Sequence, residues 1–252
     1  MLNSLKINFS RVKYILDTNK FKIIFLSILS TCFFSFFNIF PNVSYAEAIF
    51  NYISSSIFLF PLISIVFISS CIFLESFDKD YSSLLRFNDK THYLKSLLIS
   101  ISIGNFMIFL SAIIIGILFV TLKYFGLMTF SNVEYYNISY ITYSIFTIIK
   151  YFIIINVLSL IGICIHKIWG KTIGYIYYMI ILSFYYCSPI SSNIISHFSI
   201  KTFNFKYYLT SIQFASFNLE VSYTIIFICI LFLLLMLFIY SLIKFNKIRI
   251  DE

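Results

Sequence analysis

Six long apolar runs divide this chain, and they constrain its fold more than any other feature. They are Ile23–Phe40, Ile49–Leu74, Leu97–Leu122, Ile141–Ile165, Ile173–Tyr186 and Val221–Ile243. An α-helix rises about 1.5 Å per residue, so ~20 apolar residues cross the ~30 Å hydrocarbon core of a bilayer. All the runs except the short Ile173–Tyr186 are long enough. The sequence therefore predicts an all-α integral membrane protein with six transmembrane helices.

Composition excludes a soluble enzyme. Of the 252 residues, 60% are apolar and 11% are charged, whereas soluble domains are about 45–50% apolar and about 25% charged. The connections between the runs are too short to hold a nucleotide-binding domain, which needs ~100–200 residues. We therefore expect residues 1–252 to form one transmembrane domain.

The positions of Lys and Arg predict how the chain is oriented, because cytoplasmic segments of membrane proteins carry an excess of them. Fourteen precede the first run, follow the last run, or lie in the loops after the second and fourth runs. Lys123, Lys201 and Lys206 lie on the other side, and Lys150 lies inside a run. This pattern predicts that both termini are cytoplasmic. Since the positive residues are spread over four segments, the net charge of +8 indicates topology and not nucleic-acid binding.

Two segments outside the runs are amphipathic. Residues 1–20 carry basic residues beside a helical apolar stripe of Leu2, Leu5, Phe9, Val12 and Leu16. Such a stripe predicts a helix lying in the membrane interface, with a disordered basic tail as the alternative. The segment 190–218 mixes large apolar residues with Ser, Asn and Lys, which predicts an extracellular interfacial or re-entrant segment.

Lys150 is the one charge well inside an apolar run. If the helix starts at Ile141, this lysine lies ~13 Å deep, where an unpaired ammonium costs at least ~2.5–3.5 kcal/mol. One interpretation is that Lys150 faces a polar path and meets an anionic group of a substrate. The other is that it snorkels to the outer interface or that the span begins later.

The sequence lacks the motifs of membrane enzymes. It contains no HExxH, no GxSxG and no CxxC, and its three histidines are scattered, so neither catalysis nor a metal site is indicated. Gly170-Lys171-Thr172 resembles the end of a phosphate-binding loop, but Ile165 stands where that motif needs glycine. No expected span contains Asp or Glu, so a proton- or sodium-coupled carrier would lack its usual carboxylate. We therefore expect no cofactor in this chain and an energy source on another chain.

The most polar segment is 75–95, ESFDKDYSSLLRFNDKTHYLK, between the second and third runs. Its centre can form a short helix, and its mixed charges suit docking onto a soluble partner, where rim charges set register and encounter rate. An ordinary solvated loop is the alternative.

Together these features resemble an ABC-2-type (type V) exporter permease. The most specific local element is Glu75 at the membrane exit, followed by the Ser82–Leu85 sequence SSLL, Arg86 and Lys95. Many such permeases also have a Gly-Thr and a Pro in this segment, and this sequence lacks both. Small Phe- and Ile-rich permeases of this kind resemble the membrane subunits of Gram-positive peptide exporters, such as lantibiotic immunity transporters and the staphylococcal phenol-soluble-modulin exporter.

The resemblance implies a division of labour in a bacterial plasma membrane. Two permease chains, identical or different, would form the path for an amphipathic toxin or bacteriocin-like peptide, and separate P-loop ATPase subunits would bind ATP and Mg²⁺. The ATPase would dock on a coupling site of Glu75, Asp78, Asp80, Arg86, Asp89 and Lys90. A second cytoplasmic contact would come from His166, Lys167 and Lys171, and Lys150 would line the path. The alternative is a protein that works without an ATPase, either a secondary carrier or channel, or a structural subunit.

Overall fold

A computed structural model describes residue 12 and residues 19–37, 44–79, 90–123, 132–133, 137–196 and 216–244. The described part is almost entirely helical. Its helices are α2 (Asn19–Phe37), α3 (Tyr45–Ser54), α4 (Ser56–Lys79), α6 (Lys90–Lys123), α7 (Tyr140–Trp169), α8 (Lys171–Ser196) and α10 (Phe217–Lys244). Strands β1 (Asn132–Val133) and β2 (Ile138–Ser139) form a short antiparallel pair in which Asn132 lies opposite Ser139.

Four of the described helices contain segments long and apolar enough to cross a membrane. These segments are Phe58–Phe77 in α4, Thr91–Lys123 in α6, Tyr140–Trp169 in α7 and Phe217–Lys244 in α10. The expectation of a mainly helical chain with helices that could span a membrane is confirmed, and the short strand pair is the exception among the described residues. Crossing by α2 and α8, which cover the first and fifth expected runs, stays a prediction.

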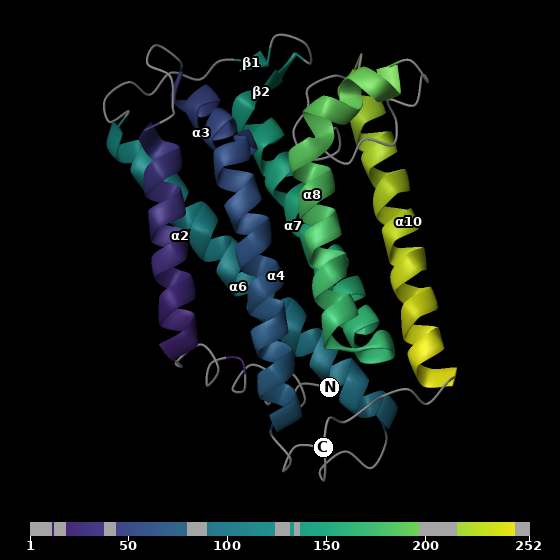
Figure 1. The fold of residues 1–252 in the computed structure, drawn as a ribbon. Helices are drawn as coiled ribbons and strands as arrows, with labels where there is room; N and C mark the ends of the chain where they lie inside the picture. The colour runs from purple at the N-terminus through teal and green to yellow at the C-terminus, as the bar shows by residue number, and fades with distance from the viewer. Residues whose placement is uncertain are drawn as a thin grey trace.

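The helix ends gather at two opposite ends of the bundle (Figure 1). One end holds the end of α4, the start of α6, the junction of α7 with α8, and the end of α10. The other end holds α3, the two strands and the start of α10. We call them the α7–α8 end and the hairpin end. The described helix ends that border the expected cytoplasmic loops, namely the end of α4, the start of α6 and the α7–α8 junction, lie at the α7–α8 end. The side of the membrane on which this end lies stays a prediction.

The second expected run, Ile49–Leu74, is wrong as a single helix, because it is broken at Ser55 into α3 and α4. Ser55 has extended backbone angles, φ −66° and ψ 136°, and its N–H donates to the carbonyl of Tyr52. Its hydroxyl accepts the N–H of Phe58 at 3.2 Å. Ser55 therefore caps both helices, a role for which serine is suited and which hydropathy does not reveal.

Helix α7 is central and α10 is peripheral. Helix α7 packs against α3, α4, α6, α8 and α10, whereas α10 packs chiefly against α7 and stands at the edge of the bundle (Figure 1). Within the apolar windows of these helices, 78% of residues are buried in α7 and 17% in α10. The contact between α7 and α10 is therefore what attaches the last helix to the rest of the described chain.

Candidate functional site

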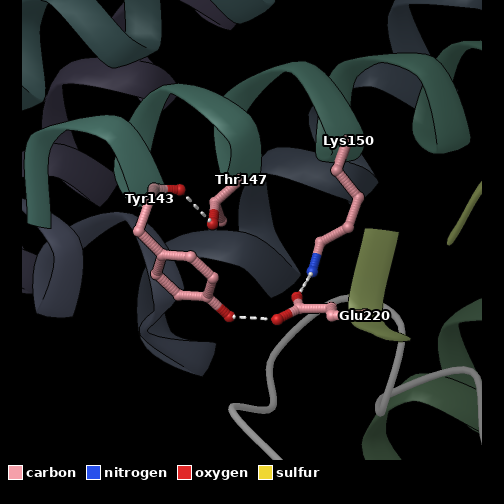
Figure 2. A network of polar contacts seen from close by, with 4 residues as sticks. All are labelled: Tyr143, Thr147, Lys150 and Glu220. Atoms are coloured by element: carbon pink, nitrogen blue, oxygen red, sulfur yellow. Dashed lines mark hydrogen bonds and ion pairs between the residues drawn. The ribbon is translucent and has the colours of Figure 1, made fainter. Parts of the chain in front are cut away.

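A buried ion pair joins α7 to α10 near the hairpin end. The Lys150 ammonium donates to Glu220 Oε1 at 2.7 Å, and the Tyr143 hydroxyl donates to Glu220 Oε2 at 2.7 Å. Figure 2 shows both contacts converging on the one carboxylate. The side chains of Lys150 and Glu220 are 3% and 0% exposed. Both oxygens of the carboxylate are thus engaged, one by a cation and one by a phenol.

Helical spacing explains how α7 presents its part of this cluster. Tyr143, Thr147 and Lys150 are four and three residues apart, so they share one face of the helix. The Thr147 hydroxyl donates to the Tyr143 carbonyl at 2.8 Å and is drawn in Figure 2. Ser139 caps the start of α7, its hydroxyl accepting the N–H of Thr142 at 3.2 Å. Lys150 consequently lies about 15 Å along the helix from Tyr140.

The start of α10 provides the carboxylate. Glu220 lies in the first turn of this helix, where the partial positive charge of the helix N-terminus favours an anion. The hydroxyl of Ser216 accepts the N–H of Leu219 at 3.3 Å, which fixes where the helix begins. The chain therefore holds Glu220 by a helix start as well as by its two partners on α7.

Aromatic rings surround the pair. The Lys150 ammonium lies 5.4 Å from the ring centroid of Phe146 and 5.6 Å from that of Tyr151. Tyr143 packs against Phe50 at 5.0 Å and Phe217 at 6.1 Å between centroids. Aromatic faces attract a cation, but they solvate it far less than water does. The pair is therefore a neutral unit enclosed in an apolar shell, in which each charge depends on the other.

The sequence analysis found Lys150 but missed Glu220. The sixth run was expected to begin at Val221, one residue too late to include the acid, whereas α10 begins at Phe217. The expectation that no span contains an acid is wrong, because the apolar segments of α10 and α4 include Glu220 and Glu75. The missed signal was the lone lysine itself: a charge inside a span needs a counter-ion, and Glu220 directly borders another run.

The environment of Lys150 excludes the interpretation that it snorkels to the interface or that its span begins later. With 3% exposure and an ion-pair partner, it is enclosed within the bundle and does not snorkel to an interface, and α7 begins at Tyr140, no later than expected. Its contact with a substrate stays a prediction.

A second polar cluster lies at the centre of the bundle and joins α4, α6 and α7. Asn105 accepts from Ser70 at 2.9 Å and donates to Asn156 and Ser159 at 3.1 Å each. The hydroxyls of Ser70 and Ser159 are 2.5 Å apart, and Asn156 donates to Ser102 at 2.8 Å. Every member contacts another, which is what buried polar groups in an apolar bundle require. This cluster carries no charge, so we interpret it as a structural clamp.

At the α7–α8 end, a third cluster links the expected coupling site to the expected second cytoplasmic contact. Lys171, the first residue of α8, donates to Glu75 near the end of α4, and the Tyr175 hydroxyl lies 3.5 Å from the same carboxylate oxygen. Hydrogen bonding to Glu75 raises the pKa of Lys171 above its ordinary value, in the direction expected for a lysine that has gained an anionic partner. The structure therefore brings Glu75 and Lys171 together.

The other expected ATPase-contact residues are placed only in part. His166 and Lys167 are buried at 6% and 4% exposure, so Lys171 is the exposed member of the second contact. Asp78 and Lys90 lie in α4 and α6. The remaining predicted residues, Asp80, Arg86 and Asp89, lie outside the described residues, as does most of the segment 190–218. Of the expected interfacial helix 1–20, the structure describes only Val12 and the last two residues, which begin α2.

Metal chemistry gains no support from the described residues, among which no three His, Cys, Asp or Glu side chains gather into a ligand set. Comparison with known proteins found no matching family model, curated protein or solved structure. Any functional conclusion therefore rests on the clusters described above.

Proposed function

We propose that this chain is the membrane-spanning permease subunit of an ATP-driven exporter in a bacterial plasma membrane. It would pair with a second permease chain to form a path for amphipathic peptides, and a separate P-loop ATPase would bind ATP and Mg²⁺. The observation that supports the proposal most is the ion pair between Glu75 and Lys171. It connects the two segments through which the resemblance places the ATPase contacts.

The ion pair would transmit a movement at the α7–α8 end to the helices of the bundle. Glu75 lies near the end of α4 and Lys171 starts α8, so a force on either segment acts on both helices. Gly170 alone separates α7 from α8, with φ 99°, a backbone conformation that favours glycine. Such a short connection makes α7 and α8 move together. An ATPase beneath this end would therefore act on α4, α7 and α8 as one unit.

Exposed positive charge is consistent with this arrangement. Near the α7–α8 end, Lys22, Lys95, Lys171 and Lys244 are exposed, and Trp169 at the end of α7 is 53% exposed. A cationic rim with an aromatic residue suits contact with lipid headgroups and with an acidic rim on a soluble partner.

Co-purification tests the proposal. The tagged chain, expressed with its genomic neighbours and extracted in mild detergent, should retain a soluble ATPase. Replacement of Asp80–Lys90 by a flexible linker of equal length should release the ATPase while the chain still inserts. Recovery of the chain without an ATPase, under conditions that keep it folded, would contradict the proposal.

Charge variants of the Glu75–Lys171 pair test the coupling. We expect Lys171→Glu to lower the peptide exported per ATP hydrolysed and the swap Glu75→Lys with Lys171→Glu to restore it. Lys22→Ala, which removes an exposed charge near the same end, is the matched control and should leave the ratio unchanged. A swap variant as uncoupled as the single variant would show that the pair does not transmit the motion.

A secondary carrier or channel that works without an ATPase is the second candidate, and Glu220 favours it. An acid within an apolar helix is a common feature of proton and ion pathways, and the sequence had suggested that none was present. Reconstitution of the purified chain alone in vesicles separates the two candidates. Transport driven by a proton or sodium gradient, without ATP, would establish the carrier and overturn the exporter.

A further inference from the structure

The contact surface between α7 and α10, which we call the seam, is polar at one end and apolar at the other. The buried residues of α10 are Glu220, Thr224, Leu231, Leu235 and Leu242, which lie along one face of the helix at spacings of four and seven. The two nearest the hairpin end are polar and the three toward the α7–α8 end are leucines. Trp169 of α7 packs on Phe238 of α10 at 6.0 Å between ring centroids, in the leucine part.

The polar part of the seam contains groups that gain from contact with water. Lys150 and Glu220 are ionised side chains removed from solvent, and separation into water would return their hydration. Thr224, 3% exposed, leaves its hydroxyl without a hydrogen-bond partner among the described residues. The leucine part has no such groups, so water entering there would meet only apolar surface. Entry of water into this seam is therefore favoured at its polar part.

We propose that α10 is a hinged helix: the cluster of Lys150, Glu220 and Tyr143 is the latch, and the Trp169–Phe238 contact marks the hinge. When the latch opens, α10 swings away from α7 at the hairpin end while the leucine part of the seam stays closed. The opening admits water or a polar ligand between the two helices, because only a polar medium stabilises the separated charges. This inference does not depend on an ATPase and would hold equally for a carrier.

The inference rests on how α10 is attached to the rest of the described chain. Among the described residues, its main packing contact is with α7, and 17% of its apolar window is buried. An apolar helix seam fixes neither register nor angle sharply, whereas one buried polar contact can fix both. The latch therefore holds α10 in place at the hairpin end.

Cross-linking at the two parts of the seam tests the hinge. In a chain whose five native cysteines are serine, one variant carries Phe146→Cys and Phe217→Cys, whose rings lie 5.2 Å apart, and another carries Trp169→Cys and Phe238→Cys. A short bifunctional thiol reagent should link both pairs. Adding Glu220→Gln should lower the yield of the first link severalfold and leave the second unchanged.

Two results would overturn the proposal. Equal loss of both links would mean that the whole seam loosens, and no loss of either would mean that the pair is no latch. Should Glu220→Gln prevent folding, Tyr143→Phe removes one hydroxyl and should lower the first link alone by a smaller factor. An unchanged first link in this variant would equally exclude Tyr143 from the latch.

Discussion

Single charges decide the stability of the α7–α10 contact because each is buried beside the other. Lys150→Met would leave the Glu220 carboxylate buried without its cation, and breaking a buried pair from one side destabilises by about 3–5 kcal/mol. Replacing both, with Lys150→Met and Glu220→Leu, removes the desolvated charges together and is close to neutral in other proteins. We therefore expect the double variant to be more stable than either single variant. Unfolding of the detergent-solubilised chain measures this, and a double variant as unstable as the singles would contradict it.

The central amide also allows a test at the level of one residue. Asn105 contacts Ser70, Asn156 and Ser159, so Asn105→Ala removes three hydrogen bonds and takes the cluster's donor away from Asn156 Oδ1, at about 1–3 kcal/mol. Ser102→Ala removes only the bond to Asn156. Single bonds between membrane helices average about 0.6 kcal/mol, so this control should change the unfolding midpoint far less. Equal shifts for the two variants would show that Asn105 is not the centre of the clamp.

At the scale of elements, hydropathy predicted where helices lie but not how they end. Each expected apolar run overlaps at least one described helix, because long apolar segments favour helices that can cross a bilayer. The break at Ser55 depends on two capping hydrogen bonds, and the start of α10 depends on a cap at Ser216. Both are local polar contacts that an apolar average does not register. Placing the start of the last helix too late had the larger consequence, because it left Glu220 outside the expected span.

For the candidate sites, the sequence likewise predicted individual residues but not which residues pair with each other. Lys150 was recognisable as a charge in an apolar run, but its partner is 70 residues away in sequence, and only the packing of α10 on α7 brings them together. Glu75 and Lys171 were both expected to contact a partner, but their contact with each other depends on α8 returning beside α4. Pairings between distant helices are properties of the tertiary structure, so spacing within one sequence did not predict them.

The packing of α8 on α7 gives a prediction for Gly174. A Cβ placed there would lie 2.8 Å from the Cβ of His166 and 3.1 Å from its Cα, so Gly174→Ala must push the two helices apart. Overpacking of this kind costs about 1–3 kcal/mol, and the displacement should weaken the Lys171–Glu75 contact. Ile176→Ala, at a residue 51% exposed on the same helix, should change the unfolding midpoint much less. Similar midpoints for both variants would contradict close packing at Gly174.

For the whole molecule, the two ends of the bundle should face opposite sides of the membrane. Asn137, in the turn before β2, is exposed at the hairpin end, and Thr172 is exposed at the α7–α8 end. In a cysteine-free background, we expect Asn137→Cys to react with a membrane-impermeant maleimide on intact cells and Thr172→Cys to react only after permeabilisation. The reverse pattern would invert the predicted orientation, and labelling of both on intact cells would contradict a membrane between the two ends.

The distance in sequence between Lys150 and Glu220 also has a consequence for how the protein is made. Their separation of 70 residues, at a synthesis rate of roughly 5–20 residues per second, means that Lys150 leaves the ribosome about 4–14 s before Glu220. During this interval α7 carries a charge whose insertion costs at least about 2.5–3.5 kcal/mol. Nascent chains that stop short of Glu220 should therefore leave α7 incompletely integrated. The last helix to be synthesised would complete the insertion of a helix made seconds earlier.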